Sequence, residues 1–249
     1  MALLLDADAT LDGERAESLL ARLRSACTAE GLNIVLPLAA RAFDAVVVRV
    51  MRAGGAPLEP RRAPAGDVIL IGDGGPTFFA RFQSATPSPR SGDPLDDFTR
   101  ARLQAIVGDL FGAAGVRAVV HFPFVSIQAA PVPFQRLGQA AGLPGPGPLG
   151  LQVHPVFGPW WAYRALIATP LRFPSTRPTA LHDSCGSCAR PCVTGCAAHA
   201  AAPRSGGLPE CGDDCGARMR CPVGVAHRYP EAQLAFHARA RERLMRVTR

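Results

Sequence analysis

The segment VHPVFGPWWAYRALI, residues 153–167, says more about the fold than any other stretch of this sequence. Apolar residues on both sides of its central Gly-Pro predict two strands around a turn. Neighbouring side chains on a strand point to opposite faces, so only one of Trp160 and Trp161 can sit in the main core. The other is either a core residue of a second layer or a flat wall for a large planar ligand. Arg164, in an otherwise apolar run, would need an anionic partner if it is buried. A well-packed hairpin is the alternative to a ligand pocket here.

The sequence around this segment predicts helices and strands without strict alternation, which is typical of an α+β fold. Residues with helical periodicity predict helices at 12–31, 93–111, 132–143 and 230–245. Short apolar runs predict buried strands at 32–40, 67–75 and 116–124. We expect Asp12 to cap the first helix and Gly31 to end it. Its buried face would consist of Leu19, Leu20, Leu23 and Cys27.

Composition narrows the class of protein and its partners. The chain has 249 residues and a formal net charge of +7, and all its basic residues are arginine. Abundant Gly and Pro beside this arginine favour a GC-rich coding sequence over a nucleic-acid surface, and no aromatic-basic motif supports nucleic acid as a partner. No apolar run approaches the ~20 residues that cross a bilayer. The start MALLLDADAT has acids where a signal peptide is basic, so we expect a cytoplasmic protein without a membrane partner.

Seven of the eight cysteines fall in one segment, residues 185–221. Disulfide frameworks suit short secreted chains, so a metal or iron–sulfur site is the better interpretation here. One [4Fe–4S] cluster, held by the first three of these cysteines and one later one, is the leading hypothesis. Two clusters with one other ligand, or a structural zinc ion, are the alternatives. The candidate metal ligands are Cys185, Cys188, Cys192, Cys196, Cys211, Cys215 and Cys221.

Residues 154–167 resemble the His-Pro-x-Phe-Gly-x-Trp-Phe-x-x-Arg strand of the CblC family of cobalamin-processing proteins. The segment HRYPEAQLAFH, residues 227–237, is similar to that family's Arg-Tyr-Ser-x-x-Gln-x-Ala-Tyr-Phe segment. This resemblance implies a nitroreductase-like mixed sheet flanked by helices, with a cavity for base-off cobalamin. From the charge of Arg164 alone, we expect it to pair with a phosphate or carboxylate of the ligand. The residues that the resemblance implies line or support the corrin site are His154, Phe157, Gly158, Trp160, Trp161 and Arg164.

The cysteine run departs from the CblC pattern. Residues 140–161, followed by CGSCARPC at 185–192, resemble epoxyqueuosine reductase, which joins a CblC-like domain to a Cys-Gly-Ser-Cys iron–sulfur segment. Reductive dehalogenases are built similarly. This resemblance implies that a cluster relays electrons from a ferredoxin or flavodoxin to cobalt. Flavin is a further cofactor that the CblC resemblance allows.

These observations predict a cobalamin-binding α+β domain at 1–180, a loop-rich iron–sulfur module at 181–226 and a C-terminal helix at 227–249 that packs on the main domain. The leading hypothesis is an oxidoreductase that reduces bound cobalamin and removes its upper ligand, such as cyanide. Reduction of an organic substrate with cobalamin as the cofactor is the second hypothesis, with Tyr163 and His121 as candidate proton donors. A non-enzymatic cobalamin carrier with a structural metal site is the third.

Overall fold

A four-stranded antiparallel sheet lies at the centre of the protein, with the strand order β1-β2-β4-β3. The computed structural model describes residues 13–52, 66–85, 93–124, 132–173, 181–194 and 216–247, without the side chains of 51, 52 and 240–247. Its strands are β1 (Ile34–Leu38), β2 (Val68–Gly74), β3 (Val119–His121) and β4 (Trp161–Ala168). Among these strands β1 and β3 form the two edges, and β1 carries Pro37.

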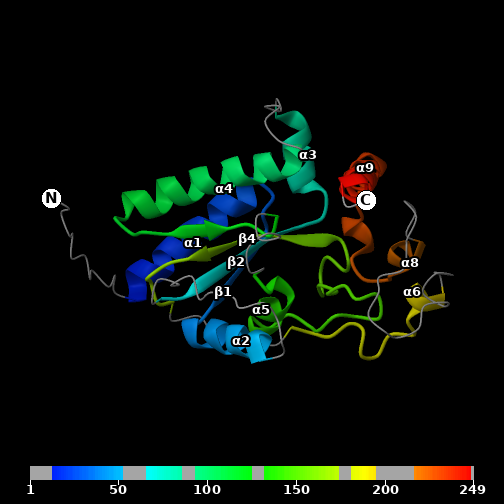
Figure 1. Cartoon of the computed structure of the whole chain (residues 1–249), viewed down its shortest axis with the longest axis horizontal. Coiled ribbons are helices and arrows are strands. Elements are labelled where there is room, and N and C mark those ends of the chain that lie inside the picture. The colour runs from blue at the N-terminus through cyan, green and yellow to red at the C-terminus, as the bar shows by residue number, and fades with distance from the viewer. Residues whose placement is uncertain are drawn as a thin grey trace.

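Helices cover both faces of the sheet (Figure 1). One face packs against α1 (Gly13–Ala29) and α4 (Pro94–Ala113), and the other against α2 (Ala40–Arg52) and α5 (Phe134–Ala140). Alternation along the strands separates the two cores, because successive side chains point to opposite faces. Ile69 and Ile71 of β2 belong to the first core, whereas Val68 and Leu70 belong to the second.

Local sequence signals explain the two long helices on the first face. The predicted face of α1 is buried, and Gly31 follows the helix at a φ of 87°, which favours glycine. The side chain of Asp93 caps α4 by accepting hydrogen bonds from the backbone N–H groups of Leu95 and Asp96. Asp12, the predicted cap of α1, lies outside the described residues.

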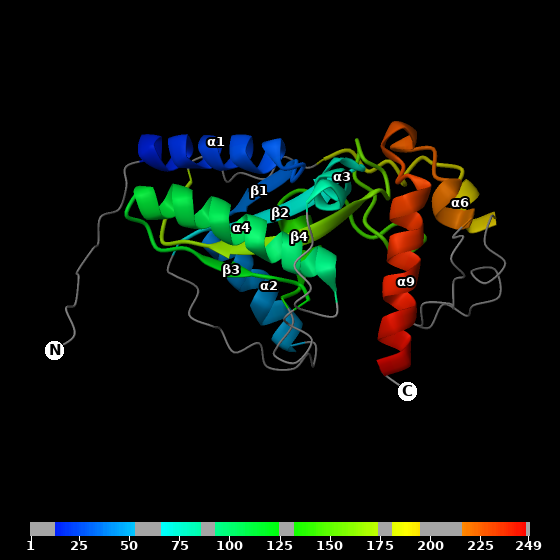
Figure 2. The same ribbon diagram turned by 90° about the horizontal axis from the view of Figure 1, so that it is seen from above.

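The C-terminal helix α9 (Glu231–Val247) crosses the end of the sheet at which β4 begins (Figure 2). Its Phe236 ring lies 5.3 Å from the ring of Phe79 and 5.4 Å from that of Phe82, both on α3 (Thr77–Ser84). The short elements α6 (Pro191–Thr194), α8 (Gly216–Met219) and η1 (Val225–His227) gather at the same end (Figure 1). This end of the sheet therefore brings residues from distant parts of the sequence together.

The pair of strands predicted around Gly158-Pro159, within residues 153–167, is wrong in its first half. Only Trp161–Ala168 forms a strand, and residues 151–160 form a looped segment with isolated bridges from Pro146 to Gln152 and from His154 to Gly158. The loop is stabilised by its own side chains, because Nδ1 of His154 accepts the backbone N–H groups of Val156 and Phe157. Turns closed in this way compete with strand pairing.

The α+β class predicted from the sequence is confirmed by the sheet and its flanking helices. No helix in the described part of the chain is both long and apolar enough to span a membrane. The division into parts at 180 and 226 stays a prediction.

Candidate functional site

A cavity of about 290 Å³ lies where β4 begins, between this strand and the segments that carry α8 and α9. We call it the aromatic cavity. Polar, aromatic and aliphatic residues all line it, as in sites that orient a small-molecule ligand. The residues that line it are Gln135, Leu151, Gln152, Pro159, Trp161, Ala162, Tyr163, Arg164, Arg218, Tyr229 and His237.

Trp161 and Tyr163 form the aromatic wall on the sheet side, and Gln152 holds both. The indole Nε1 of Trp161 donates to the backbone oxygen of Gln152 at 2.8 Å, and the Tyr163 hydroxyl donates to its Oε1 at 2.6 Å. The two rings lie 4.6 Å apart in an edge-to-face arrangement. Burial raises the pKa of Tyr163, so its hydroxyl stays protonated at neutral pH.

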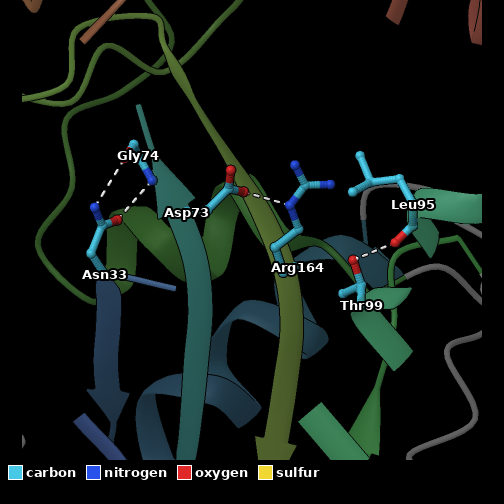
Figure 3. Close-up of polar contacts among 6 residues, drawn as sticks. All are labelled: Asn33, Asp73, Gly74, Leu95, Thr99 and Arg164. Atoms are coloured by element: carbon cyan, nitrogen blue, oxygen red, sulfur yellow. Dashed lines mark hydrogen bonds and ion pairs between the residues drawn. The ribbon is translucent and has the colours of Figure 1, made fainter. Parts of the chain in front are cut away.

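Arg164 forms a buried ion pair with Asp73 of β2 (Figure 3). Its Nε donates to Oδ1 of Asp73 at 2.5 Å, and the guanidinium lies over the ring of Phe78 at 5.4 Å. Burial alone would lower the pKa of Arg164, but the Asp73 carboxylate outweighs it and raises that pKa. The sequence-based expectation that Arg164 pairs with a ligand anion therefore needs correction, because its anionic partner comes from the neighbouring strand.

The opposite wall of the aromatic cavity comes from the C-terminal segments. The guanidinium of Arg218 lies over the rings of Trp160 and Tyr229, 4.5 Å and 4.7 Å from their centres, and donates to the backbone oxygen of Pro159 at 2.6 Å. Burial, reinforced by Asp73, raises the pKa of Tyr229 to about 12. Burial, together with Arg164 and Arg218, lowers the pKa of His237 to about 4. At neutral pH the cavity therefore presents a neutral phenol, a neutral imidazole and arginine charge.

His154, Phe157 and Gly158 lie behind this cavity and shape the loop that forms part of its wall. Burial, with a smaller repulsion from His227, lowers the pKa of His154 to about 4, so the neutral imidazole accepts backbone hydrogen bonds. Phe157 fills the space over Gly74, where a Cβ atom would lie 2.3 Å from its ring. These residues support the site through the loop.

Close backbone contact joins this loop to the segment that follows α8. Gly158 has a φ of 60°, and a Cβ atom there would lie 2.0 Å from the carbonyl oxygen of Val223. Gly224 has a φ of 70°, and a Cβ atom there would lie 2.2 Å from the carbonyl oxygen of Phe157. Glycine is needed at both positions, since a side chain would force the two segments apart. The contact fixes Cys221 beside the loop.

Four thiols line a second cavity on the other side of residues 151–159. We call it the cysteine cavity; its cysteines are Cys185, Cys188, Cys192 and Cys221. Burial raises the pKa of Cys185 and of Cys192; the Asp183 carboxylate adds to the effect on Cys185, and neighbouring thiolates add to both. The backbone N–H of Arg190 points at the Cys188 sulfur at 3.4 Å, a contact typical of metal-binding cysteine turns. Leu151 and Pro159 line both cavities.

The four thiols lie around a single cavity. Among the described residues, no three His, Cys, Asp or Glu side chains form a group that could hold a single metal ion. Cys196, Cys211 and Cys215 lie outside the described residues. Cys27 is buried in α1, far from this cavity in the sequence, and burial raises its pKa to about 12.

Only some of the six residues predicted for the corrin site line the aromatic cavity in the structure. Trp161 and Arg164 line the aromatic cavity, and Trp160 is buried behind it against Tyr229. Sequence reasoning missed Gln152, Arg218 and His237 as cavity residues. The segment 227–237 was the only signal for the last of these, because it resembles a CblC motif. His121, the other proposed proton donor, lies on β3 and does not line the cavity.

Comparison with known proteins supports the fold through structural similarity at low sequence identity. No protein-family model and no curated protein sequence matches the chain. The crystal structure of the B12-trafficking protein CblC from C. elegans aligns with a TM-score of 0.60 and 14% identity, covering 90% of this chain and 92% of that one. This similarity confirms the fold that the CblC resemblance implies.

Epoxyqueuosine reductases are also among the similar structures. The enzyme from Bacillus subtilis aligns with a TM-score of 0.48 and 16% identity, covering 75% of this chain and 52% of that one. The enzyme from Streptococcus thermophilus aligns with a TM-score of 0.47 and 13% identity, covering 72% of this chain and 52% of that one. The chain therefore spans about half the length of these reductases.

Proposed function

We propose that this chain binds base-off cobalamin in the aromatic cavity and reduces it with electrons that arrive through an iron–sulfur cluster in the cysteine cavity. The observation that carries this proposal is the wall shared by the two cavities. Leu151 and Pro159 line both, so a ligand in one site and a cluster in the other would be separated by a single layer of side chains. Close approach of two redox centres is what electron transfer requires.

The [4Fe–4S] part of this proposal is supported by the chemistry of the side chains around the cysteine cavity. Four thiolates are the usual ligands of such a cluster, which supplies one-electron transfer. Cys185, Cys188, Cys192 and Cys221 provide four sulfurs around one cavity, and the last precedes a proline, as in bacterial ferredoxin runs. An all-cysteine set also suits a structural zinc ion, but the geometry of the described thiols favours zinc less, because no three of them form a group that could hold a single ion.

The aromatic cavity fits part of a cobalamin molecule, which would extend beyond its volume of about 290 Å³. The rings of Trp161 and Tyr163 are tilted by 67° to each other, so one of them can lie flat against a planar macrocycle while the other meets it with its edge. Arg218, Gln135 and His237 offer donors and acceptors to polar side arms. Bound cobalamin supplies the redox-active cobalt, and the residues of the chain position it.

Anaerobic purification followed by UV–visible spectroscopy tests both cofactors in one preparation. We expect iron and sulfide at ~4 per chain, and a spectral change when cyanocobalamin and a reductant are added. That change should report reduction of the corrin and loss of cyanide. Cobalamin that binds without any spectral change under reductant would contradict the proposed activity, and zinc without iron would favour a carrier with a structural metal site.

A pair of cysteine variants distinguishes the role of the cysteine cavity from that of the aromatic cavity. Cys221→Ala should lose most of its iron and its reductive activity, yet it should still bind hydroxocobalamin. Cys27→Ala is the matched control, because this buried cysteine lies in α1 and lines neither cavity. It should keep its iron. Equal iron content in the two variants would show that Cys221 is not a ligand of the cluster.

Reduction of an organic substrate is the second candidate function. It is favoured by Tyr229, a buried phenol that lines the aromatic cavity and keeps its proton at neutral pH. Such a group can deliver a proton to a reduced substrate. Turnover of an added epoxide or organohalide, with cobalamin remaining bound, would favour this function over removal of the upper ligand.

A further inference from the structure

Gln152 is a buried side chain whose hydrogen bonds are all satisfied at the wall of the aromatic cavity. Its Nε2 donates to the backbone oxygens of Gln135 at 3.1 Å and Pro144 at 2.9 Å. Its Oε1 and its backbone oxygen accept from Tyr163 and Trp161, respectively. Gln152 therefore links the rings of Trp161 and Tyr163 to the segments that contain Gln135 and Pro144.

The partners of Gln152 also fix the direction of each hydrogen bond. The carbonyl oxygens of Gln135 and Pro144 can only accept, so the amide nitrogen of Gln152 has to face them. The amide oxygen then faces Tyr163 and cannot donate, so the Tyr163 hydroxyl has to give its proton to Gln152. A ligand that binds this hydroxyl can reach only its lone pairs.

We propose that Gln152 is a positioning residue that holds Trp161 and Tyr163 in place for the ligand and makes Tyr163 a hydrogen-bond acceptor toward it. Ligand groups with N–H donors, such as primary amides, are the class that this wall recognises. Tyr163 is then not the proton donor of the site. The identity of the ligand as cobalamin, whose corrin carries primary amides, rests on the proposed function.

A ligand-free experiment tests the positioning role without any cofactor. Trp160 and Trp161 are the two tryptophans of the chain, so a Trp160→Phe background leaves Trp161 as the sole fluorescent indole. In this background Gln152→Met should increase quenching of Trp161 by acrylamide about two- to threefold. The substitution removes the side-chain hydrogen bonds that hold residue 152 in place, and the backbone oxygen of this residue is what binds the indole of Trp161. Gln139→Met, at an exposed glutamine of α5, is the matched control and should leave quenching unchanged.

Binding of hydroxocobalamin tests the coupling between Gln152 and Tyr163. Gln152→Met should raise the Kd about tenfold and Tyr163→Phe about threefold. The double variant should stay near tenfold, because the two changes remove one shared interaction. Gln152→Glu keeps the size and the acceptor but has no N–H groups for the two carbonyls, so its Kd should rise as much as that of Gln152→Met.

Additive losses of about thirtyfold in the double variant would overturn the proposal. So would a Gln152→Glu variant that binds like the wild type, or quenching in Gln152→Met equal to that of Gln139→Met. Far-UV circular dichroism of each variant establishes that the fold is retained. If the wild type binds no cobalamin, the proposed function fails, and the quenching comparison alone decides whether Gln152 positions Trp161.

Discussion

At the scale of single residues, the ion pair of Asp73 and Arg164 shows how the site depends on the sheet beneath it. Both side chains are almost fully buried, and Oδ2 of Asp73 has no protein partner among the described residues. Removing one member of a buried pair leaves the other charge unpaired in a poorly solvated place. The pair therefore fixes Arg164 at the cavity floor and makes it sensitive to substitution.

We expect Arg164→Met to lower the free energy of unfolding by about 3–5 kcal/mol, measured by urea denaturation. The double variant Asp73→Leu with Arg164→Met should lose less, because no isolated charge remains buried. Arg102→Met, which breaks the solvent-accessible pair between an exposed Arg102 and a half-buried Glu30, should cost only about 0–1 kcal/mol. Equal losses for Arg164→Met and Arg102→Met would contradict the role of burial.

His154 predicts a pH dependence of stability. In the folded protein its pKa is about 4, against ~6.5 for the unfolded chain. Between these values the unfolded state binds a proton that the folded state excludes, so stability is complete above the unfolded pKa and falls as the pH drops toward 4. The loss amounts to ~3 kcal/mol at most.

Urea denaturation between pH 7.5 and pH 4.5 measures this effect. Asn can replace the Nδ1 acceptor with its side-chain oxygen and does not titrate, so His154→Asn should show a shallower slope than the wild type. Part of the slope should remain, because the pKa of His237 is lowered to the same range. Identical slopes would show that His154 does not contribute.

At the scale of elements, the loop at residues 151–160 decides the geometry of both cavities. The sequence suggested a strand there, because its apolar residues flank a Gly-Pro turn. The strand does not form, because His154 satisfies backbone N–H groups that strand pairing would otherwise use. Such local competition between a side chain and a neighbouring strand depends on packing, so the pattern of apolar residues could not reveal it.

Gly158→Ala tests the contact between this loop and the segment after α8. Its Cβ would collide with the Val223 carbonyl oxygen, so we expect a loss of several kcal/mol in addition to the ~1 kcal/mol of a left-handed backbone. Gly115→Ala is the matched control, with a φ of 69° and no atom within 4 Å of the added Cβ. Thermal denaturation and iron content measure the two effects. Iron loss should occur only in Gly158→Ala.

At the scale of the whole molecule, the fold was more predictable than the site. The buried face of α1 follows from periodicity, because one apolar stripe is enough to define a helix. Trp161 and Arg164 were found because they belong to a recognisable strand motif. Arg218 and His237 reach the same cavity from a distant segment of the chain, and only tertiary packing brings them there. No pattern in the sequence indicates the role of Gln152, because that role depends on four hydrogen-bond partners that come together only in the folded chain.

The packing of α9 should connect overall stability with the site. Phe236→Ala removes the ring contacts with α3 and should cost about 2–3 kcal/mol. It should also weaken hydroxocobalamin binding, because His237 follows directly on the same helix. Arg239→Ala, at an exposed position of α9, should change neither quantity. Calorimetry and a binding titration measure both, and unaltered affinity in Phe236→Ala would show that α9 does not shape the cavity.

Pro37 has a consequence for how copies of this protein meet. An edge strand presents free N–H and C=O groups on which a second chain can add a strand, and this is a common start of aggregation. Proline has no N–H and is accommodated in edge strands with that position facing solvent. On β1 it removes one donor from a strand of five residues. The opposite edge, β3, has only three residues. Both edges of the sheet that the described strands form are thus poor templates for intermolecular β-sheet growth, and the candidate site lies away from them, at the end of the sheet.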